Sequence, residues 1–287
     1  MMGCITRAFA LACGMVALGS SAWAADATVS STDELYRGWL KMYDLKFDEA
    51  HRVFDPWKQT HPQDSLGPAS DAAAYLFSEL ARLGTLESEL FTDNTRFVDR
   101  AKLHPDPAVR TRFNNEIDRA EQLADAALKS SGTDQNALFA KSLTFGLRAD
   151  YAGLVDKQDL TALKYTKDGR VYADKLMSVN PNAYDAYLGP GVENYLLSFK
   201  AAPVRVLLRW TGSRVDRETG LEQLRLTAQH GHYLEPFAKL ILAVAALRDK
   251  NQARAKDLLQ ELHARFPNNQ LYLKELNRVG SSAGAGQ

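Results

Sequence analysis

Large apolar side chains recur every three or four residues along most of this chain, with polar residues between them. The first such stripe runs over residues 35–43, and a second follows over 47–57 after a short polar break. This spacing is typical of amphipathic α-helices, because it places the apolar side chains on one helical face. Pro62 then marks the end of the unit, since proline cannot continue a helix and disfavours helical geometry at His61. The pattern predicts a helix, a tight turn and a second helix.

The same pattern returns near the C-terminus. Apolar residues between 237 and 247 share one helical face, residues 249–251 are polar, and a second apolar stripe covers 255–262. Signals for strands are sparse, since no Asn-Gly or Asp-Gly pair is flanked by alternating apolar residues. The sequence therefore predicts an all-α fold.

Both helical units resemble tetratricopeptide (TPR) repeats, as found in TPR-like proteins of the secreted bacterial type. In such a repeat of about 34 residues, the second helix carries a small residue, then a large apolar residue four positions later, and proline after the helix. The two units share these spacings: Ala50, Phe54 and Pro62 in the first, and Ala255, Leu259 and Pro267 in the second. The resemblance implies an α-solenoid of stacked antiparallel helix pairs, a TPR-like superhelix.

The low stability of isolated helices also favours the stacking of helix pairs. A lone helical hairpin leaves an apolar face in water, so each unit has to cover its neighbour. We expect a single TPR-like α-solenoid over residues 32–279, preceded by a flexible N-terminus (25–31) and followed by a disordered Gly/Ser/Ala tail (280–287). The boundaries of the repeats between 85 and 174 stay open.

The first 24 residues have the layout of an export signal peptide (1–24). Arg7 precedes an apolar run of about 11 residues, which is shorter than the roughly 20 needed to span a bilayer. A small-x-small site ends at Ala24, so we predict cleavage there and a periplasmic or extracellular mature protein. Cys4 and Cys13 fall within the removed segment, which leaves the exported form without a thiol. The less favoured alternative is lipid attachment at Cys13.

The charge balance excludes one large class of partners. The chain has 35 basic and 35 acidic residues, so it lacks the positive excess typical of nucleic-acid-binding domains. One local stretch, residues 200–217, is basic and interrupted by apolar residues. An alternative hypothesis makes this stretch, through Arg205, Arg209 and Arg214, a peripheral contact with anionic lipid or polysaccharide. The competing interpretation is a solvated face whose arginines pair with neighbouring acids.

The side chains that could bind a metal or take part in catalysis do not form a recognisable catalytic set. His230 and His232 flank a glycine close to Glu235, which is a partial zinc or copper site without a third or fourth ligand of typical spacing. Histidines at a helix junction also serve as ordinary helix-end residues. The Gly-x-Ser-x-Gly at 280–284 lacks the strand–turn–helix context that its chemistry needs. We therefore name no catalytic residue and no cofactor, and expect a protein that is not an enzyme.

The leading hypothesis is an exported, non-catalytic scaffold that binds a peptide or a partner protein. Stacked helix pairs create an extended concave surface from their first helices. The resemblance to TPR proteins implies that this surface includes the following residues: Tyr36, Tyr43, Asp185, Asn194 and Tyr195.

Overall fold

Helices follow one another throughout the part of the chain that the structure describes. The computed structural model describes residues 34–85, 103–199 and 215–284, so the predicted signal peptide and the segment 25–31 lie outside the described residues. Residues 34–43 form the first helix. The α-helices after it are α2 (Phe47–Thr60), α3 (Leu66–Arg82), α6 (Pro107–Ser130), α7 (Gln135–Asp150), α8 (Asp159–Val179), α9 (Leu188–Leu197), α11 (Arg217–His230), α12 (Glu235–Arg248), α13 (Gln252–Arg265) and α14 (Gln270–Gly284). A π-helical turn, η1 (Tyr151–Val155), follows α7, and a 3₁₀ turn, η2 (Tyr184–Tyr187), precedes α9.

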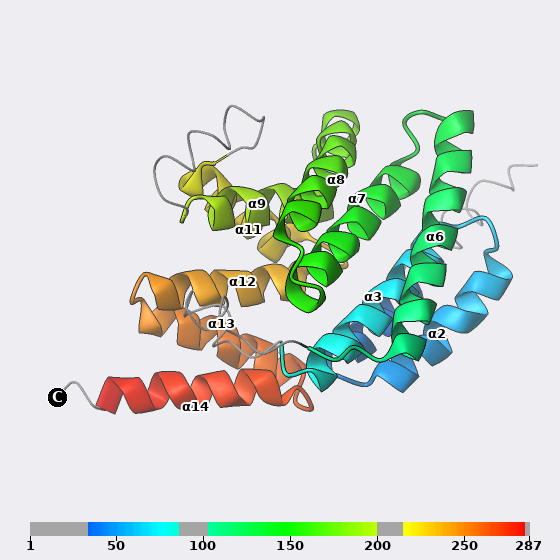
Figure 1. Cartoon of the computed structure of the whole chain (residues 1–287). Coiled ribbons are helices and arrows are strands. Elements are labelled where there is room, and N and C mark those ends of the chain that lie inside the picture. The colour runs from blue at the N-terminus through cyan, green and yellow to red at the C-terminus, as the bar shows by residue number, and fades with distance from the viewer. Residues whose placement is uncertain (1–33, 86–102, 200–214, 285–287) are drawn as a thin grey trace, which may run out of the picture. The chain divides into compact units, whose positions relative to one another are not determined.

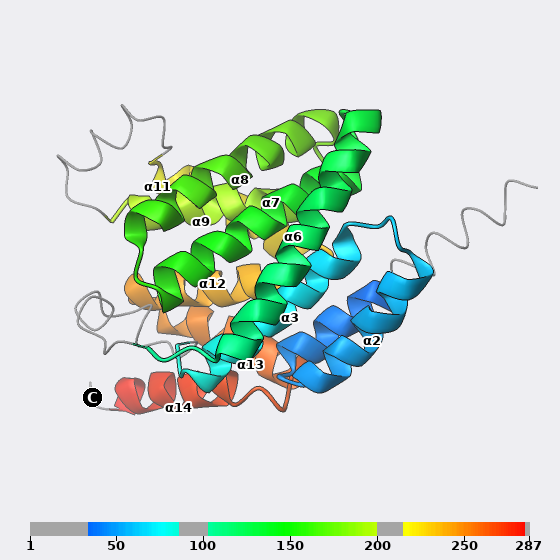
Figure 2. The same cartoon turned by 45° about the vertical axis from the view of Figure 1, so that its right-hand side comes forward.

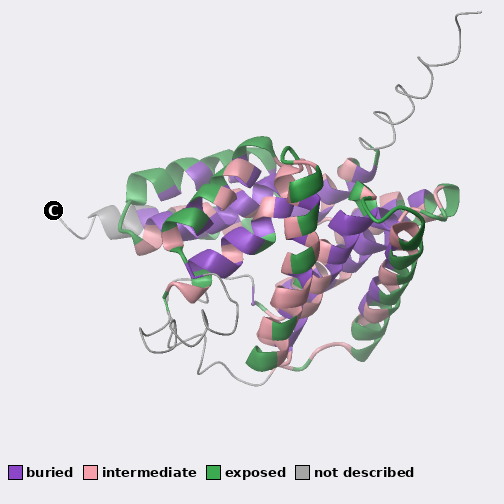
Figure 3. Cartoon of the chain, turned by 90° about the horizontal axis from the view of Figure 1, so that it is seen from above, coloured by how far each residue is buried: buried purple, intermediate pink, exposed green. Residues whose placement is uncertain are grey.

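These helices pack mostly against their neighbours in sequence. Successive contacts join α2 to α3, α3 to α6, α6 to α7 and α7 to α8, and later α9 to α11, α11 to α12, α12 to α13 and α13 to α14 (Figures 1 and 2). Buried residues lie on the sides of the helices that face other helices, and exposed residues lie on the outward sides (Figure 3). The prediction of an all-α fold is confirmed within the described residues.

The two terminal units have the helices that their apolar spacing predicts. In the first unit, helix 34–43 and α2 are separated by a short turn, and in the last unit α12 and α13 are separated by another. Ala50 and Phe54 are fully buried, as are Ala255 and Leu259. Side-chain caps define several helix starts, because an aspartate oxygen accepts otherwise unpaired backbone N–H groups. Asp106 caps α6 in this way.

The first helix also contacts residues from the far end of the chain. Asn269 Nδ2 donates a hydrogen bond of 2.9 Å to the Tyr43 carbonyl oxygen, across 226 positions. Asn268 donates to both oxygens of Asp44, from its backbone N at 2.9 Å and from Nδ2 at 2.7 Å. These contacts are additional to the nearest-neighbour packing that describes a simple solenoid.

The C-terminal helix reaches further than the sequence indicates. Helix α14 continues to Gly284, so residues 280–284, which were expected to belong to a disordered tail, are helical. The structure describes side chains only as far as Val279, which is buried. In the described residues, none of the helices combines the length and the apolar character needed to cross a bilayer.

Helices α9 and α11 approach closely through two glycines. A Cβ atom on Gly220 would lie 2.6 Å from the backbone nitrogen of Tyr195 and 2.9 Å from the carbonyl oxygen of Gly191. Backbone atoms cannot move aside as a flexible side chain can, so the crossing requires a residue without a side chain.

Substitution of Gly220 by alanine tests this requirement. We expect Gly220→Ala to lower the free energy of unfolding by about 1–3 kcal/mol, because the added methyl group overpacks the helix crossing. Gly146→Ala is the matched control, since Gly146 lies in α7 with no atom within 4 Å of an added Cβ. That control is expected to be neutral or stabilising by up to about 1 kcal/mol. Urea unfolding curves measure both values, and equal stability of the two variants would contradict the close approach.

A carboxyl group at the end of α7 makes stability depend on pH. Burial raises the pKa of Asp150 to about 7, and no nearby cation opposes this rise in the described part of the chain. In the unfolded chain an aspartate has a pKa of about 3.9. The folded state therefore binds more protons than the unfolded state between these two values, and stability falls as pH rises through this window.

Replacement of Asp150 by asparagine removes the free energy that is needed to ionise this buried carboxyl group. The stability of Asp150→Asn relative to the parent protein is expected to increase by about 2–3 kcal/mol between pH 5 and pH 8. Urea unfolding at the two pH values measures the difference. The exposed Asp257, changed in the same way, is the control and should show no such trend. A gain for Asp150→Asn that does not change with pH would contradict the assigned pKa.

Candidate functional site

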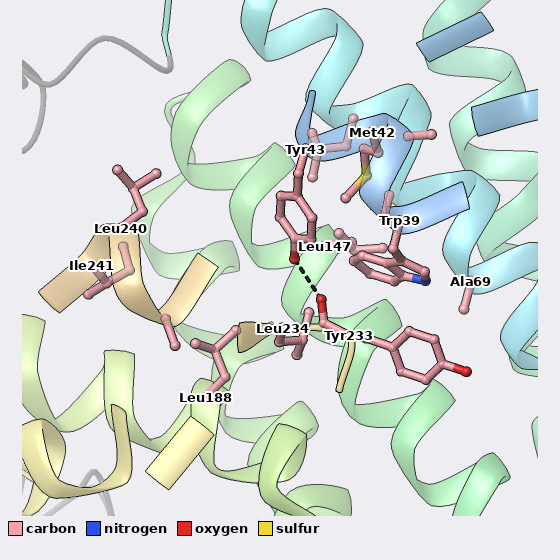
Figure 4. Close-up of a cluster of buried hydrophobic side chains, with 14 of the residues drawn as sticks. Trp39, Met42, Tyr43, Ala69, Leu147, Leu188, Tyr233, Leu234, Leu240 and Ile241 are labelled. Carbon is pink, nitrogen blue, oxygen red and sulfur yellow. Dashed lines mark hydrogen bonds between the residues drawn. The ribbon is translucent and has the colours of Figure 1, made fainter. Parts of the chain in front are cut away.

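Three of the five predicted partner-binding residues meet at one place in the structure. Tyr36 and Tyr43 from helix 34–43 and Asp185 from η2 converge on the residues that connect α11 to α12. We call this place the α11–α12 junction, comprising those three residues, the connecting segment 231–234, and Glu235 and Arg265 beside it. Figure 4 shows its centre, with Trp39 and Tyr43 pointing toward Tyr233 and Leu234.

Asp185 holds the backbone of the connecting segment. Its Oδ2 accepts hydrogen bonds of 3.1 Å from the backbone N–H groups of His232 and Tyr233, and its Oδ1 accepts one of 2.9 Å from Leu234. Burial raises the pKa of Asp185, and the three N–H groups oppose that rise. Gly231 is needed here, because a Cβ atom would lie 2.5 Å from the Thr227 carbonyl oxygen and 2.8 Å from Asp185 Oδ1.

The side chain of Tyr233 occupies an aromatic pocket. Its ring centroid lies 5.6 Å from that of Trp39 and 6.0 Å from that of Phe139, to which it is nearly parallel. The Tyr43 hydroxyl donates a hydrogen bond of 2.9 Å to the Tyr233 carbonyl oxygen (Figure 4). Burial raises the pKa of Tyr43 well above its usual value, so this hydroxyl stays protonated and remains a donor. The protein therefore holds its own bent connecting segment by backbone hydrogen bonds and aromatic contacts.

A charged network lies beside this pocket. Arg265 donates to the Tyr36 hydroxyl and, at 2.5 Å, to Glu235. Lys239 pairs with Glu235 at 2.6 Å on the same helix. The Tyr36 ring packs on His232 with centroids 4.4 Å apart. Burial raises the pKa of Tyr36, whereas the Arg265 charge opposes the rise.

The other two predicted partner-binding residues belong to a different part of the structure. Asn194 and Tyr195 lie on α9 and are buried against the rest of the protein, with relative exposures of 1% and 0%. Asn194 Nδ2 donates to Gln223 Oε1 of α11 at 3.0 Å. In this conformation both residues contribute to the α9–α11 packing and not to an open surface.

Of the basic stretch 200–217, the structure describes only residues 215–217. Arg205, Arg209 and Arg214 lie outside the described residues. Arg217, which ends the stretch, donates to both oxygens of Asp249 at 2.6 and 2.5 Å and to Glu218 at 2.8 Å. The charge of Arg217 is thus paired within the protein.

The histidines near the junction make ring contacts. His230 packs on Tyr184 with centroids 4.8 Å apart, and His232 packs on Tyr36. Among the residues that the structure describes, no group of three or more His, Cys, Asp and Glu side chains is arranged to hold a metal ion.

The sequence does not indicate two important residues of the α11–α12 junction. Tyr233 and Arg265 contact residues of the first helix that lie about 190 and 229 positions away. No local pattern links positions so far apart. In the sequence, the cluster of polar and aromatic residues at 230–235 indicates that this segment is unusual. Its histidines suggested a metal site and not a packing role for Tyr233.

Comparison with protein-family models gave no match, and comparison with curated protein sequences gave none either.

Removal of the Asp185 carboxylate tests whether it organises the junction. Asp185→Ala leaves three backbone N–H groups without their acceptor, and we expect a loss of about 2–4 kcal/mol in the free energy of unfolding. Asp257→Ala, on the exposed side of α13, is the control and should change stability by no more than about 0.5 kcal/mol. Thermal and urea unfolding measure both, and similar losses in the two variants would contradict the assigned role of Asp185.

Proposed function

We propose that this chain is an exported interaction protein, a TPR-like α-solenoid that binds a peptide or an extended segment of a partner protein. The observation that carries the proposal is the α11–α12 junction. There, the chain holds its own bent connecting segment with a carboxylate on successive N–H groups, a tyrosine hydroxyl on a carbonyl and aromatic contacts to the Tyr233 ring. Hydrogen bonds to backbone groups and contacts with aromatic side chains are also the means by which a protein surface holds a segment of a partner.

The order of helix contacts supports the proposed solenoid. Helix 34–43 packs on α2, where Gly38 lies against the Phe54 ring, and α12 and α13 form the last complete pair before α14. Short turns join the helices in both pairs, as the repeat pattern requires. Because a fold by itself does not define a function, the choice of binding surface rests on the side chains next to the junction.

Partly buried aromatic side chains offer a surface for the partner. Phe77 of α3 and Phe237 of α12 contact each other edge to face with ring centroids 5.7 Å apart, and each keeps some exposed surface. Tyr36 is partly buried as well, and its partner Arg265 has a side chain 37% exposed. Aromatic residues and arginine are the side chains most often responsible for binding energy at interfaces. We propose two contact points for the partner segment: Phe77 with Phe237, and Tyr36 with Arg265 beside the buried Tyr233.

Docking on anionic lipid or polysaccharide is the alternative hypothesis. Its arginines at 205, 209 and 214 lie outside the described residues, and Arg217 already has acidic partners. No described contact favours that alternative over a solvated face.

Site-specific photo-cross-linking tests the proposed surface. The full-length protein, expressed in its native host, carries p-benzoylphenylalanine in place of Phe77 or, as a control, in place of Leu160, which is 85% exposed on α8. We expect a discrete protein adduct at position 77 that is missing at position 160. The partner identified in that adduct should bind the double variant Tyr36→Ala/Phe77→Ala about tenfold or more weakly. Absence of a specific adduct at position 77, or unchanged affinity of the double variant, would refute the proposed surface.

A further inference from the structure

Helix α8 keeps one side exposed to solvent. It packs on α7, on α9 and on the short turns η1 and η2, and it lies at the outside of the protein (Figure 2). Three of the six exposed large apolar side chains in the described part of the chain belong to this helix: Leu160, 85% exposed, Val171, 64% exposed, and Val179, 38% exposed. Single exposed apolar residues are ordinary, but several on one helix mark a surface that a partner can cover.

Lysines alternate with the two most exposed of these apolar side chains. Five residues follow one another at intervals of three or four, which places them along one line of the helix: Leu160, Lys164, Lys167, Val171 and Lys175. At a rise of about 1.5 Å per residue, this line is about 22 Å long. We call these five residues the α8 stripe.

The α8 stripe carries an excess of positive charge. Lys164 and Lys175 are exposed, and neither forms an ion pair with the residues that the structure describes. The acidic residues of the helix lie off the line, since Asp168 and Asp174 are partly buried at its two margins and Asp159 lies farther round the helix. The exposed line therefore presents ammonium groups between aliphatic side chains.

Tyrosines lie between the α8 stripe and α7. The ring centroids of Tyr165 and Tyr172 lie 6.3 and 5.8 Å from that of Phe145 on α7, and both tyrosines keep part of their surface exposed. Tyrosine is enriched at the interface between a bilayer and water, because its ring is apolar and its hydroxyl is polar. Lysine, exposed aliphatic residues and tyrosine together are the side chains that suit the headgroup region of a membrane.

We propose that the α8 stripe docks the protein on a bilayer that contains anionic phospholipids. The lysine ammonium groups lie at the lipid phosphates, and Leu160 and Val171 enter the boundary between headgroups and acyl chains. A bilayer offers phosphate and hydrocarbon along its whole surface, so it matches an alternating line without a fixed register. An acidic protein partner would instead need two apolar pockets about three helical turns apart, with carboxylates between them.

This surface is separate from the others considered above. It includes none of the residues of the proposed partner-binding surface, and it does not depend on that proposed function. It is also distinct from the basic stretch 200–217, whose arginines form a different hypothesis.

Sedimentation of the full-length protein with lipid vesicles tests the α8 stripe. We expect Lys164→Gln/Lys175→Gln to weaken binding to vesicles of phosphatidylglycerol and phosphatidylcholine by about tenfold or more, because each lysine at an anionic surface contributes about a factor of five. Leu160→Gln/Val171→Gln should weaken binding by about fivefold or more, through loss of apolar burial.

The matched control is Arg254→Gln/Lys256→Gln. It also removes two positive charges, from the exposed side of α13, and it should bind as the parent protein does. Equal binding of the parent protein, the control and both α8 variants would overturn the proposal. So would equal binding of the parent protein to vesicles of phosphatidylcholine alone, because the stripe requires anionic lipid.

A third variant separates the α8 stripe from the basic stretch 200–217. Arg205→Gln/Arg209→Gln removes two charges from that stretch and is expected to keep most of the binding to anionic vesicles. A larger loss in this variant than in Lys164→Gln/Lys175→Gln would assign the lipid contact to the stretch and overturn docking through α8.

Photo-cross-linking reports which face meets the lipid. With p-benzoylphenylalanine in place of Leu160, mass spectrometry should detect a phosphatidylglycerol adduct on anionic vesicles, and the same substitution at the exposed Asp257 on α13 should give none. Equal adducts at both positions, or none at position 160, would contradict docking through α8. A discrete protein adduct at position 160 in the native host would overturn the lipid surface in favour of a protein partner.

Discussion

The segment between α11 and α12 bends, and within the described residues only the N–H group of its first residue, Gly231, donates to a carbonyl of α11, that of Thr227 at 2.8 Å. Buried N–H groups require acceptors, and the Asp185 carboxylate accepts hydrogen bonds from three of them in succession. The Tyr43 hydroxyl satisfies the Tyr233 carbonyl of the same segment. This requirement links the first helix, η2 and the start of α12, so the α11–α12 junction depends on residues from three distant parts of the chain.

A second set of hydrogen bonds joins the end of the first helix to the turn between α13 and α14. Asp44 and the Tyr43 carbonyl accept hydrogen bonds from Asn268 and Asn269, between α13 and α14. Helix pairs that pack only on their neighbours have terminal faces exposed to water. Here the first helix contacts the turn between α13 and α14 as well as its own neighbours, and the Tyr43 ring lies 5.7 Å from that of Phe266.

Glu79 and Lys58, unlike Asp150, are largely buried charged side chains that are matched by opposite charges or N–H donors. Burial alone would raise the pKa of Glu79, but Arg82 and the Asp106 N–H outweigh it and lower that pKa. Lys58 is similarly surrounded by carboxylates, which raise its pKa despite burial.

The sequence by itself determined where several helices lie, because apolar spacing and helix-ending prolines are local properties. Ala50, Phe54, Ala255 and Leu259 were identified as interior positions in this way, and all are buried. The sequence also marked Tyr36, Tyr43 and Asp185 as residues of interest, but not what they contact. Only the tertiary structure decided that Asp185 binds residues 232–234. A side chain's partner depends on distance and burial in three dimensions, which the periodicity of a single helix does not encode.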